Sequence, residues 1–191
     1  IYFKHMILYH GSPYLFEKFD LSGAGEGTGI KFGFGVYLTE VEKSAVHYSQ
    51  PRNLEFMPDH YLYTVEIPDL TDDNHIISGM PVSPIIVDKV KERLGIVIPP
   101  KHIAKGKEFR KWIGTQLTGA TKAGLAEEKA AAEFLNSLDV LYNVWPTAQT
   151  KPDGPKNIAV FDASNVRIIK CEKIEITKDK DKWVLVNRKE I

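Results

Sequence analysis

The sequence has one cysteine, no excess of charge and no long apolar run, and each of these features excludes a class of protein. Cys171 is the single cysteine among 191 residues, so no intrachain disulfide can form and a reducing compartment is the simpler inference. The 25 Lys and Arg residues equal the 25 Asp and Glu residues, which removes the general electrostatic case for a nucleic-acid binder. Because no apolar run approaches the length of a bilayer span, we expect a cytoplasmic protein without membrane contact.

The N-terminal residues, IYFKHM, have the look of a cloning remnant. We interpret residues 1–5 as a tag remnant and Met6 as the natural start, and with them removed no charged segment precedes an apolar one, so we predict no secretory signal. A hydrophobic content of 43% with 26% charged residues is ordinary for a globular protein. No linker divides the chain, and we expect a single domain over residues 6–191 that ends in a β-hairpin.

Apolar segments of strand and helix character alternate irregularly along the chain, which is typical of the α+β class. Thr39 with Glu42 three positions later fits a capping box, and this predicts a helix from about residue 40 to Tyr48. The expected strands are 6–10, 34–40, 60–69, 157–162, 166–171 and the two arms of a hairpin that turns at 178–182. The other expected helices are 84–94, 107–118 and 126–138.

The segment GAGEGTGIKFGFGVYLTE, residues 23–40, is unusually rich in glycine. Its spacing matches neither a dinucleotide-binding fingerprint nor a phosphate-binding loop with lysine and a hydroxyl residue, so we predict a surface loop over 23–29. Gly33 and Gly35 precede Tyr37 by four and two positions, and Gly11 follows His10. Glycines beside a strand let another group approach the backbone closely, and here we interpret them as clearance for a ligand.

Three segments resemble the ADP-ribosyltransferase superfamily, specifically the diphtheria-toxin and poly(ADP-ribose) polymerase side whose motif is written H-Y-E. They are LYHGS at 8–12, GFGVYLTEVEKSAVHY at 33–48 and NIAVFDASNV at 157–166. A closer likeness is to the transferase domains of bacterial and phage polyvalent proteins, which also have a helix like EKAAAEFLNSL before the final strand. The resemblance covers nearly all of residues 6–170.

The resemblance implies a split β-sandwich of two small, roughly orthogonal sheets with flanking helices, and NAD⁺ as co-substrate. His10 would bond a ribose hydroxyl, and Tyr37 and Tyr48 would clamp the cationic nicotinamide ring between aromatic faces, each worth about 0.5–2 kcal/mol. The other residues that the resemblance places at NAD⁺ are Gly11, whose backbone would pair with the carboxamide, Ser12 near the adenosine-side ribose, and Ala45.

Cleavage of the ribose–nicotinamide bond develops positive charge on the ribose, which the family usually stabilises with a glutamate. This sequence has Asn157 at that position, as is common in the polyvalent branch. An amide accepts a hydrogen bond from the ribose 2′-hydroxyl but brings no charge, so chain elongation is not expected. Asp162, Glu128 and Glu133 are the candidate substitute carboxylates.

By resemblance we expect a mono-ADP-ribosyltransferase that acts as a toxin or effector in bacterial or phage conflict, in the cytoplasm of its host or of a target cell. Its acceptor is a protein, a nucleic acid or a small molecule, and an antitoxin or immunity protein is a candidate partner. No histidine has metal-ligand spacing, so we expect no metal. Two alternatives remain, an NAD⁺ glycohydrolase and a silent module that binds NAD⁺ or ADP-ribose. An RNA 2′-phosphotransferase shares the fold but requires several arginines at its pocket.

Overall fold

The computed structural model describes residues 4–23 and 30–191, and this part of the chain holds eight strands and four α-helices of the α+β class. The loop expected over 23–29 lies outside the described residues except for Gly23, as do the first three residues of the expected remnant. The strands are β1 His5–Ser12, β2 Val36–Thr39, β3 Tyr61–Pro68, β4 His75–Ile77, β5 Tyr142–Pro146, β6 Lys156–Val160, β7 Arg167–Asp179 and β8 Lys182–Glu190. The helices are α1 Glu42–Tyr48, α2 Pro84–Leu94, α3 Gly106–Thr118 and α4 Leu125–Ser137.

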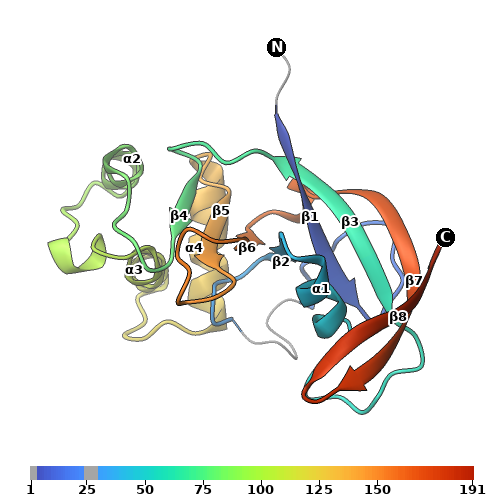
Figure 1. The fold of residues 1–191 in the computed structure, drawn as a ribbon. Helices are drawn as coiled ribbons and strands as arrows, with labels where there is room; N and C mark the ends of the chain where they lie inside the picture. Colours follow the sequence, from blue (N-terminus) through green and yellow to red (C-terminus); the bar gives the residue numbers. More distant parts are fainter. Residues whose placement is uncertain (1–3, 24–29) are drawn as a thin grey trace.

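All eight strands belong to one hydrogen-bonded sheet, in the order β4-β5-β6-β2-β1-β3-β7-β8. β4 and β5 run parallel, and the other neighbours are antiparallel. The middle joint differs from the others, because β1 pairs with β2 only at Tyr9 and Thr39, whereas β1 pairs with β3 along its whole length. The sheet is thus continuous where two separate sheets were expected, but a single pair joins its two four-stranded halves (Figure 1).

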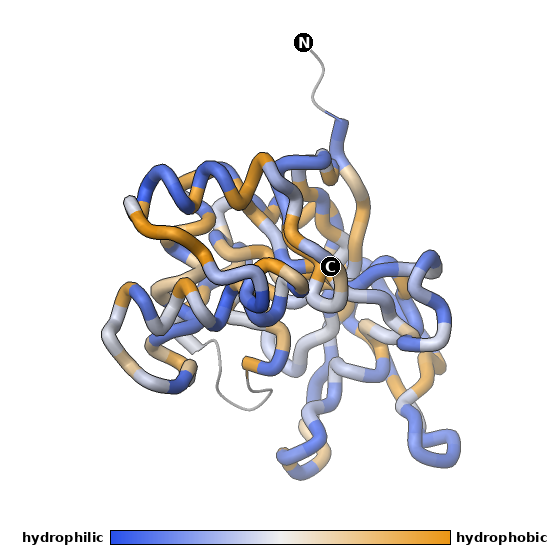
Figure 2. Tube along the Cα trace, turned by 90° about the vertical axis from the view of Figure 1, so that its left-hand side faces the viewer, coloured by the Kyte–Doolittle hydropathy of each residue, from blue (hydrophilic) through white to orange (hydrophobic). Residues whose placement is uncertain are grey.

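Two apolar clusters form most of the core. One lies on the face of the sheet that carries Leu8, Leu38 and Val65, all of them buried. The other lies among α2, α3 and α4, where Ile86, Ile113 and similar side chains are fully buried. These three helices gather at the β4–β5 end of the sheet, while α1 packs on β1 and β8 (Figure 1). The helices nearest the viewer in Figure 2 alternate hydrophobic and hydrophilic residues, as expected for helices with one buried face.

Helix α1 begins later than the sequence predicted. Strand β2 continues through Thr39, so Thr39 is not the N-cap. Its Oγ1 instead accepts a hydrogen bond from the backbone N–H of Val41 at 3.1 Å, and Val41 is an N-cap without a side-chain bond. The predicted capping box is therefore wrong, because sheet pairing competes with helix capping for the same threonine.

The end of the expected tag remnant takes part in the sheet. His5 lies opposite Pro68 in the β1–β3 ladder, and the carbonyl of Lys4 accepts a hydrogen bond from the N–H of Asp69 at 3.0 Å.

Within the described ranges, no helix combines the length and the apolar character that crossing a membrane requires.

Candidate functional site

The three motif segments lie on three adjacent strands, β1, β2 and β6. β2 stands between the other two, with Tyr9 of β1 and Asn157 of β6 both opposite Thr39. Residues separated by more than 140 positions in the sequence therefore meet at the middle joint of the sheet. The arrangement brings together the strand segments that carry His10, Tyr37 and Asn157.

The imidazole of His10 contacts the second motif directly. Its Nδ1 lies 2.7 Å from the main-chain carbonyl oxygen of Tyr37, and because a carbonyl only accepts, Nδ1 must donate its proton. Burial lowers the pKa of His10 below its usual value, although the Tyr37 carbonyl opposes this shift. A neutral imidazole that donates from Nδ1 keeps a lone pair on Nε2, so His10 is prepared to accept a hydrogen bond from a hydroxyl group.

Aromatic side chains surround the His10 ring. Phe19 meets it edge-on with ring centroids 5.0 Å apart, and Phe16 and Tyr63 lie at 6.4 and 6.3 Å. Phe16 stacks on Tyr63 at 4.4 Å, and the Tyr63 hydroxyl donates to the carbonyl of Tyr14 and accepts from the N–H of Phe16. The loop after β1 is thereby fastened beside His10, and the imidazole is half-buried.

The side chains of His10 and Tyr37 project to opposite faces of the sheet. Tyr9 and Thr39 are directly opposed and so share a face, and alternation along each strand puts Tyr37 on that face and His10 on the other. The burial pattern agrees, because Leu8 and Leu38 are both in the core cluster on the face of His10. The two motifs therefore meet through the imidazole and a backbone carbonyl, and their side chains do not face each other.

The hydroxyl of Tyr37 is fully engaged by the short turn that precedes β2. It donates to the carbonyl of Gly33 at 2.6 Å and accepts from the N–H of Phe32 at 3.1 Å. Burial raises the pKa of this hydroxyl to about 12. The ring meets Trp145 edge-on, with centroids 5.5 Å apart. Tyr37 therefore has a fixed position and stays un-ionised at physiological pH.

Phe32, Trp145 and Asn143 complete the surroundings of Tyr37, and sequence reasoning missed these roles. Phe32 stacks on Trp145 with centroids 4.0 Å apart and planes 2° apart. The side-chain amide of buried Asn143 donates to the Phe32 carbonyl at 2.8 Å. No local signal in the sequence connects Phe32 with residues more than 100 positions later.

The clearance at two of the predicted ligand-facing glycines is used by the protein's own backbone. A Cβ built on Gly11 would lie 1.8 Å from the carbonyl oxygen of Ala45 in α1, and one built on Gly35 would lie 2.5 Å from the carbonyl oxygen of Val160 in β6. Gly33 adopts φ +98°, a left-handed conformation that favours glycine. Helix packing, strand packing and a turn therefore explain these glycines without a ligand.

Asn157 lies on β6 between Thr39 of β2 and Trp145 of β5. Its Oδ1 is buried, and among the described residues it has no hydrogen-bond partner. A buried acceptor without a partner costs free energy, and such a group is a candidate for contact with a ligand or water. Asn157 thus presents an available acceptor on the Tyr37 face of the sheet.

Of the three candidate carboxylates, only Glu128 lies near Tyr37. Its charge acts on the Tyr37 hydroxyl, as does that of Arg110, but Glu128 is bonded to Arg110 at 2.6 Å. Asp162 instead accepts hydrogen bonds from the N–H of Ser164 and from Asn136. Glu133 is exposed on α4. The structure therefore provides no unpaired carboxylate from this set beside Asn157.

The remaining predicted residues lie on α1 or at the end of β1. Tyr48 is 57% exposed at the end of α1, where its ring meets that of His47. Ala45 is buried with its carbonyl against Gly11. Ser12 is buried at the end of β1, and its Oγ accepts from the N–H of Tyr14 at 3.1 Å. Ser12 therefore fastens the loop after β1, and no contact joins Tyr48 to Tyr37.

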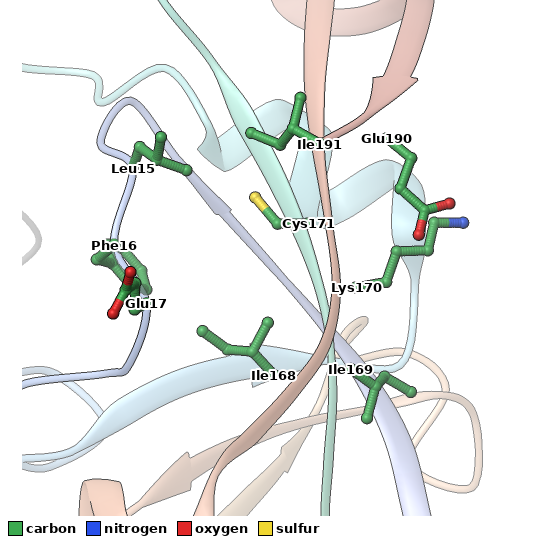
Figure 3. Close-up of a pocket in the computed structure, with 9 residues that line it drawn as sticks. All are labelled: Leu15, Phe16, Glu17, Ile168, Ile169, Lys170, Cys171, Glu190 and Ile191. Carbon is green, nitrogen blue, oxygen red and sulfur yellow. The ribbon is translucent and has the colours of Figure 1, made fainter.

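A pocket of about 710 Å³ lies beside the loop after β1 but contains none of the predicted site residues. Figure 3 shows Leu15 and Phe16 on one side of it and Ile168, Cys171 and Ile191 on the other. Phe16 lines this pocket and also lies edge-on to His10, so its ring separates the pocket from the imidazole. In the described ranges, no three His, Cys, Asp or Glu side chains are grouped to hold a metal ion.

Comparisons with protein-family models, with curated proteins and with solved structures found no significant match to this chain.

Proposed function

We propose that this protein is an NAD⁺-dependent mono-ADP-ribosyltransferase. The observation that carries the proposal is the hydrogen bond from Nδ1 of His10 to the carbonyl of Tyr37. It joins two motifs that the resemblance associates with NAD⁺, and through it His10 holds the strand of Tyr37 from the opposite face of the sheet. The joint of two half-sheets by one pair also supports the split β-sandwich that the resemblance implies.

In the proposed reaction the bond between ribose C1′ and the nicotinamide nitrogen breaks, and its electron pair leaves with nicotinamide. A nucleophile on the acceptor then bonds to C1′ and loses its proton to solvent. The ring of Tyr37 and the exposed ring of Tyr48 provide aromatic faces for nicotinamide, and Oδ1 of Asn157, which has no partner among the described residues, accepts a hydrogen bond from the 2′-hydroxyl. The resemblance also assigns Gly11, Ser12 and Ala45 to NAD⁺, but Gly11 packs against the carbonyl of Ala45 and Ser12 fastens the loop after β1.

A second candidate, a module that binds NAD⁺ or ADP-ribose without turnover, is favoured by the charges near Tyr37. Glu128 is neutralised by Arg110, and Asn157 carries no charge, so neither residue would bring a free negative charge to the developing oxocarbenium ion. The third candidate, NAD⁺ glycohydrolase activity, differs only in using water as the acceptor. The setting, a bacterial or phage toxin or effector with an antitoxin, rests on the resemblance alone.

The test is nicotinamide release from NAD⁺, measured with and without bacterial lysate, for the wild type, His10→Ala and Tyr37→Ala. His5→Ala is a matched control, because His5 is an exposed histidine on the same strand. We expect release that rises with lysate, is lost in both site variants and persists in the control. Release of free ADP-ribose without lysate identifies a glycohydrolase. Binding of NAD⁺ without release identifies the silent module, and absence of both refutes an NAD⁺ site.

A further inference from the structure

Arg110 and Glu128 form an ion pair that is almost completely removed from solvent. Their side chains are 0% and 1% exposed, and Nε of Arg110 donates to Oε2 of Glu128 at 2.6 Å. Arg110 lies on α3 and Glu128 on α4, so the pair joins the two helices. Nη1 of Arg110 and Oε1 of Glu128 have no hydrogen-bond partner in the part of the chain that the structure describes. Within the described ranges the pair is therefore incompletely satisfied as well as buried.

A pair of this kind is a poor source of stability. Removing two charges from water costs several kcal/mol for each ion, and replacing a buried pair with apolar residues of similar volume is often neutral or stabilising. The two unpartnered atoms increase the cost further. A contribution to positioning explains its presence better than a contribution to the free energy of folding.

The contacts of Arg110 lead to Tyr37 through the turn before β2. Nη2 of Arg110 donates to the carbonyl of Lys31 at 3.4 Å. A Cβ built on Gly33 would lie 3.0 Å from both Cδ and Nε of Arg110, so the turn rests directly on the arginine. The same turn holds the Tyr37 hydroxyl from both sides, through the carbonyl of Gly33 and the N–H of Phe32.

We propose that the Arg110–Glu128 pair is a positioning element that supports the Lys31–Gly33 turn and thereby fixes the ring of Tyr37. Glu128 orients the guanidinium group, and the guanidinium group fits under a turn that has no side chain at Gly33. Arg110 and Glu128 are positioning residues, because their contacts reach Tyr37 through the turn. The effect on NAD⁺ turnover rests on the proposed function, whereas the position of Tyr37 does not.

The experiment replaces the pair with apolar residues, in the double variant Arg110→Met/Glu128→Leu. The control is Arg167→Met/Glu66→Leu, which removes a surface pair whose arginine is 69% exposed. Tyr37 is followed by NMR with ¹³Cζ-labelled tyrosine and assigned with Tyr37→Phe. The wild-type hydroxyl should remain un-ionised to about pH 11, because burial raises its pKa to about 12. The charges of Arg110 and Glu128 act on this pKa in opposite directions, so their joint removal leaves burial as its main cause. In the double variant we expect the ring to gain solvent and its pKa to fall toward 10.0, the ordinary value for tyrosine, while the midpoint of urea unfolding stays near that of the wild type.

Arg110→Lys keeps the charge but offers one nitrogen in place of a fork, so it cannot bond Glu128 and Lys31 in the same way. We expect an intermediate fall in the Tyr37 pKa, and this variant decides the question if the double variant does not fold. If nicotinamide release occurs, we expect kcat to fall by about 10²-fold with little change in KM, as for a misplaced contact group. A folded variant that keeps the wild-type pKa of Tyr37 overturns the proposal. Absence of release in the wild type refutes the proposed function but leaves the Tyr37 titration decisive for this one.

Discussion

Gly11→Ala distinguishes a structural glycine from a ligand-binding one. An added Cβ would lie 1.8 Å from the carbonyl oxygen of Ala45, 2.8 Å from its carbonyl carbon and 2.9 Å from the N–H nitrogen of Ser49. An ordinary carbon–oxygen contact is about 3.3 Å or longer, so α1 must retreat by roughly 1.5 Å. All three atoms are backbone, and no side chain can rotate to relieve the contact.

The displacement would loosen a small core that α1 shares with the β1-β3-β7-β8 half of the sheet. Ala45 and Val46 are buried there against Leu62 and Ile174. Overpacking of this kind costs about 1–3 kcal/mol, and more when backbone must move. We expect about 3 kcal/mol for Gly11→Ala, which corresponds to a fall in Tm of about 6–12 °C for a chain of this size.

Urea and thermal unfolding followed by circular dichroism measure this loss. Gly79→Ala is the control, because nothing lies within 4 Å of a Cβ built there and its φ is not positive, so we expect a change within about 0.5 kcal/mol. If Gly11→Ala unfolds like the wild type but no longer binds NAD⁺, the packing argument is refuted and the clearance serves a ligand.

Three further changes test other contacts. Tyr63→Phe removes a hydroxyl that bonds Tyr14 and Phe16, and we expect a loss of about 1–2 kcal/mol in urea unfolding; no loss would show that the loop after β1 is held by packing alone. The pKa of Glu172 is lowered mainly by its hydrogen bonds from Arg188, so stability from this carboxylate is present above its usual pKa of 4.5 and is lost as pH falls through the lower folded value. Glu172→Gln should lose this acid dependence, and an unchanged pH profile would contradict the assignment. Burial lowers the pKa of His10, so as pH falls this imidazole is protonated in the unfolded chain before it is protonated in the folded one. The contribution of His10 to the free energy of unfolding should therefore be full above about pH 6.5 and decline as pH falls below it. His10→Asn should remove that part of the decline, as measured by the difference between the two unfolding profiles.

Elements whose signals are local could be predicted from the sequence. Helix α2 begins with Pro84, ends before Gly95 in a left-handed conformation, and matches the expected range 84–94. The C-terminal hairpin turns within 178–182, as the charge run indicated. In each case the residues that fix the element lie inside it or next to it.

Elements that depend on distant pairing were missed or misplaced. Strand β5 was not expected, because Tyr142–Val144 are buried on both faces and show no alternation of polar and apolar residues. The polar Asn143 is buried there because its side-chain amide donates a hydrogen bond to the distant carbonyl of Phe32. Strand β4 has three residues and exists through parallel pairing with β5. Thr39 is the last residue of strand β2 and does not cap helix α1 as predicted. None of these outcomes is encoded within a short window of sequence.

In the candidate site too, features with a local sequence signal were predicted and features that depend on distant contacts were not. The sequence pattern predicted a role for His10 and Tyr37, and in the structure a hydrogen bond joins these two residues. We interpreted the nearby glycines as clearance for a ligand, yet the space beside two of them is filled by the protein's own backbone. Glycines beside a motif residue are therefore weak evidence for a ligand until the space beside them is known. Oδ1 of Asn157 is a better reason to test for a ligand, because it is buried without a partner among the described residues and lies on a motif strand beside that of Tyr37.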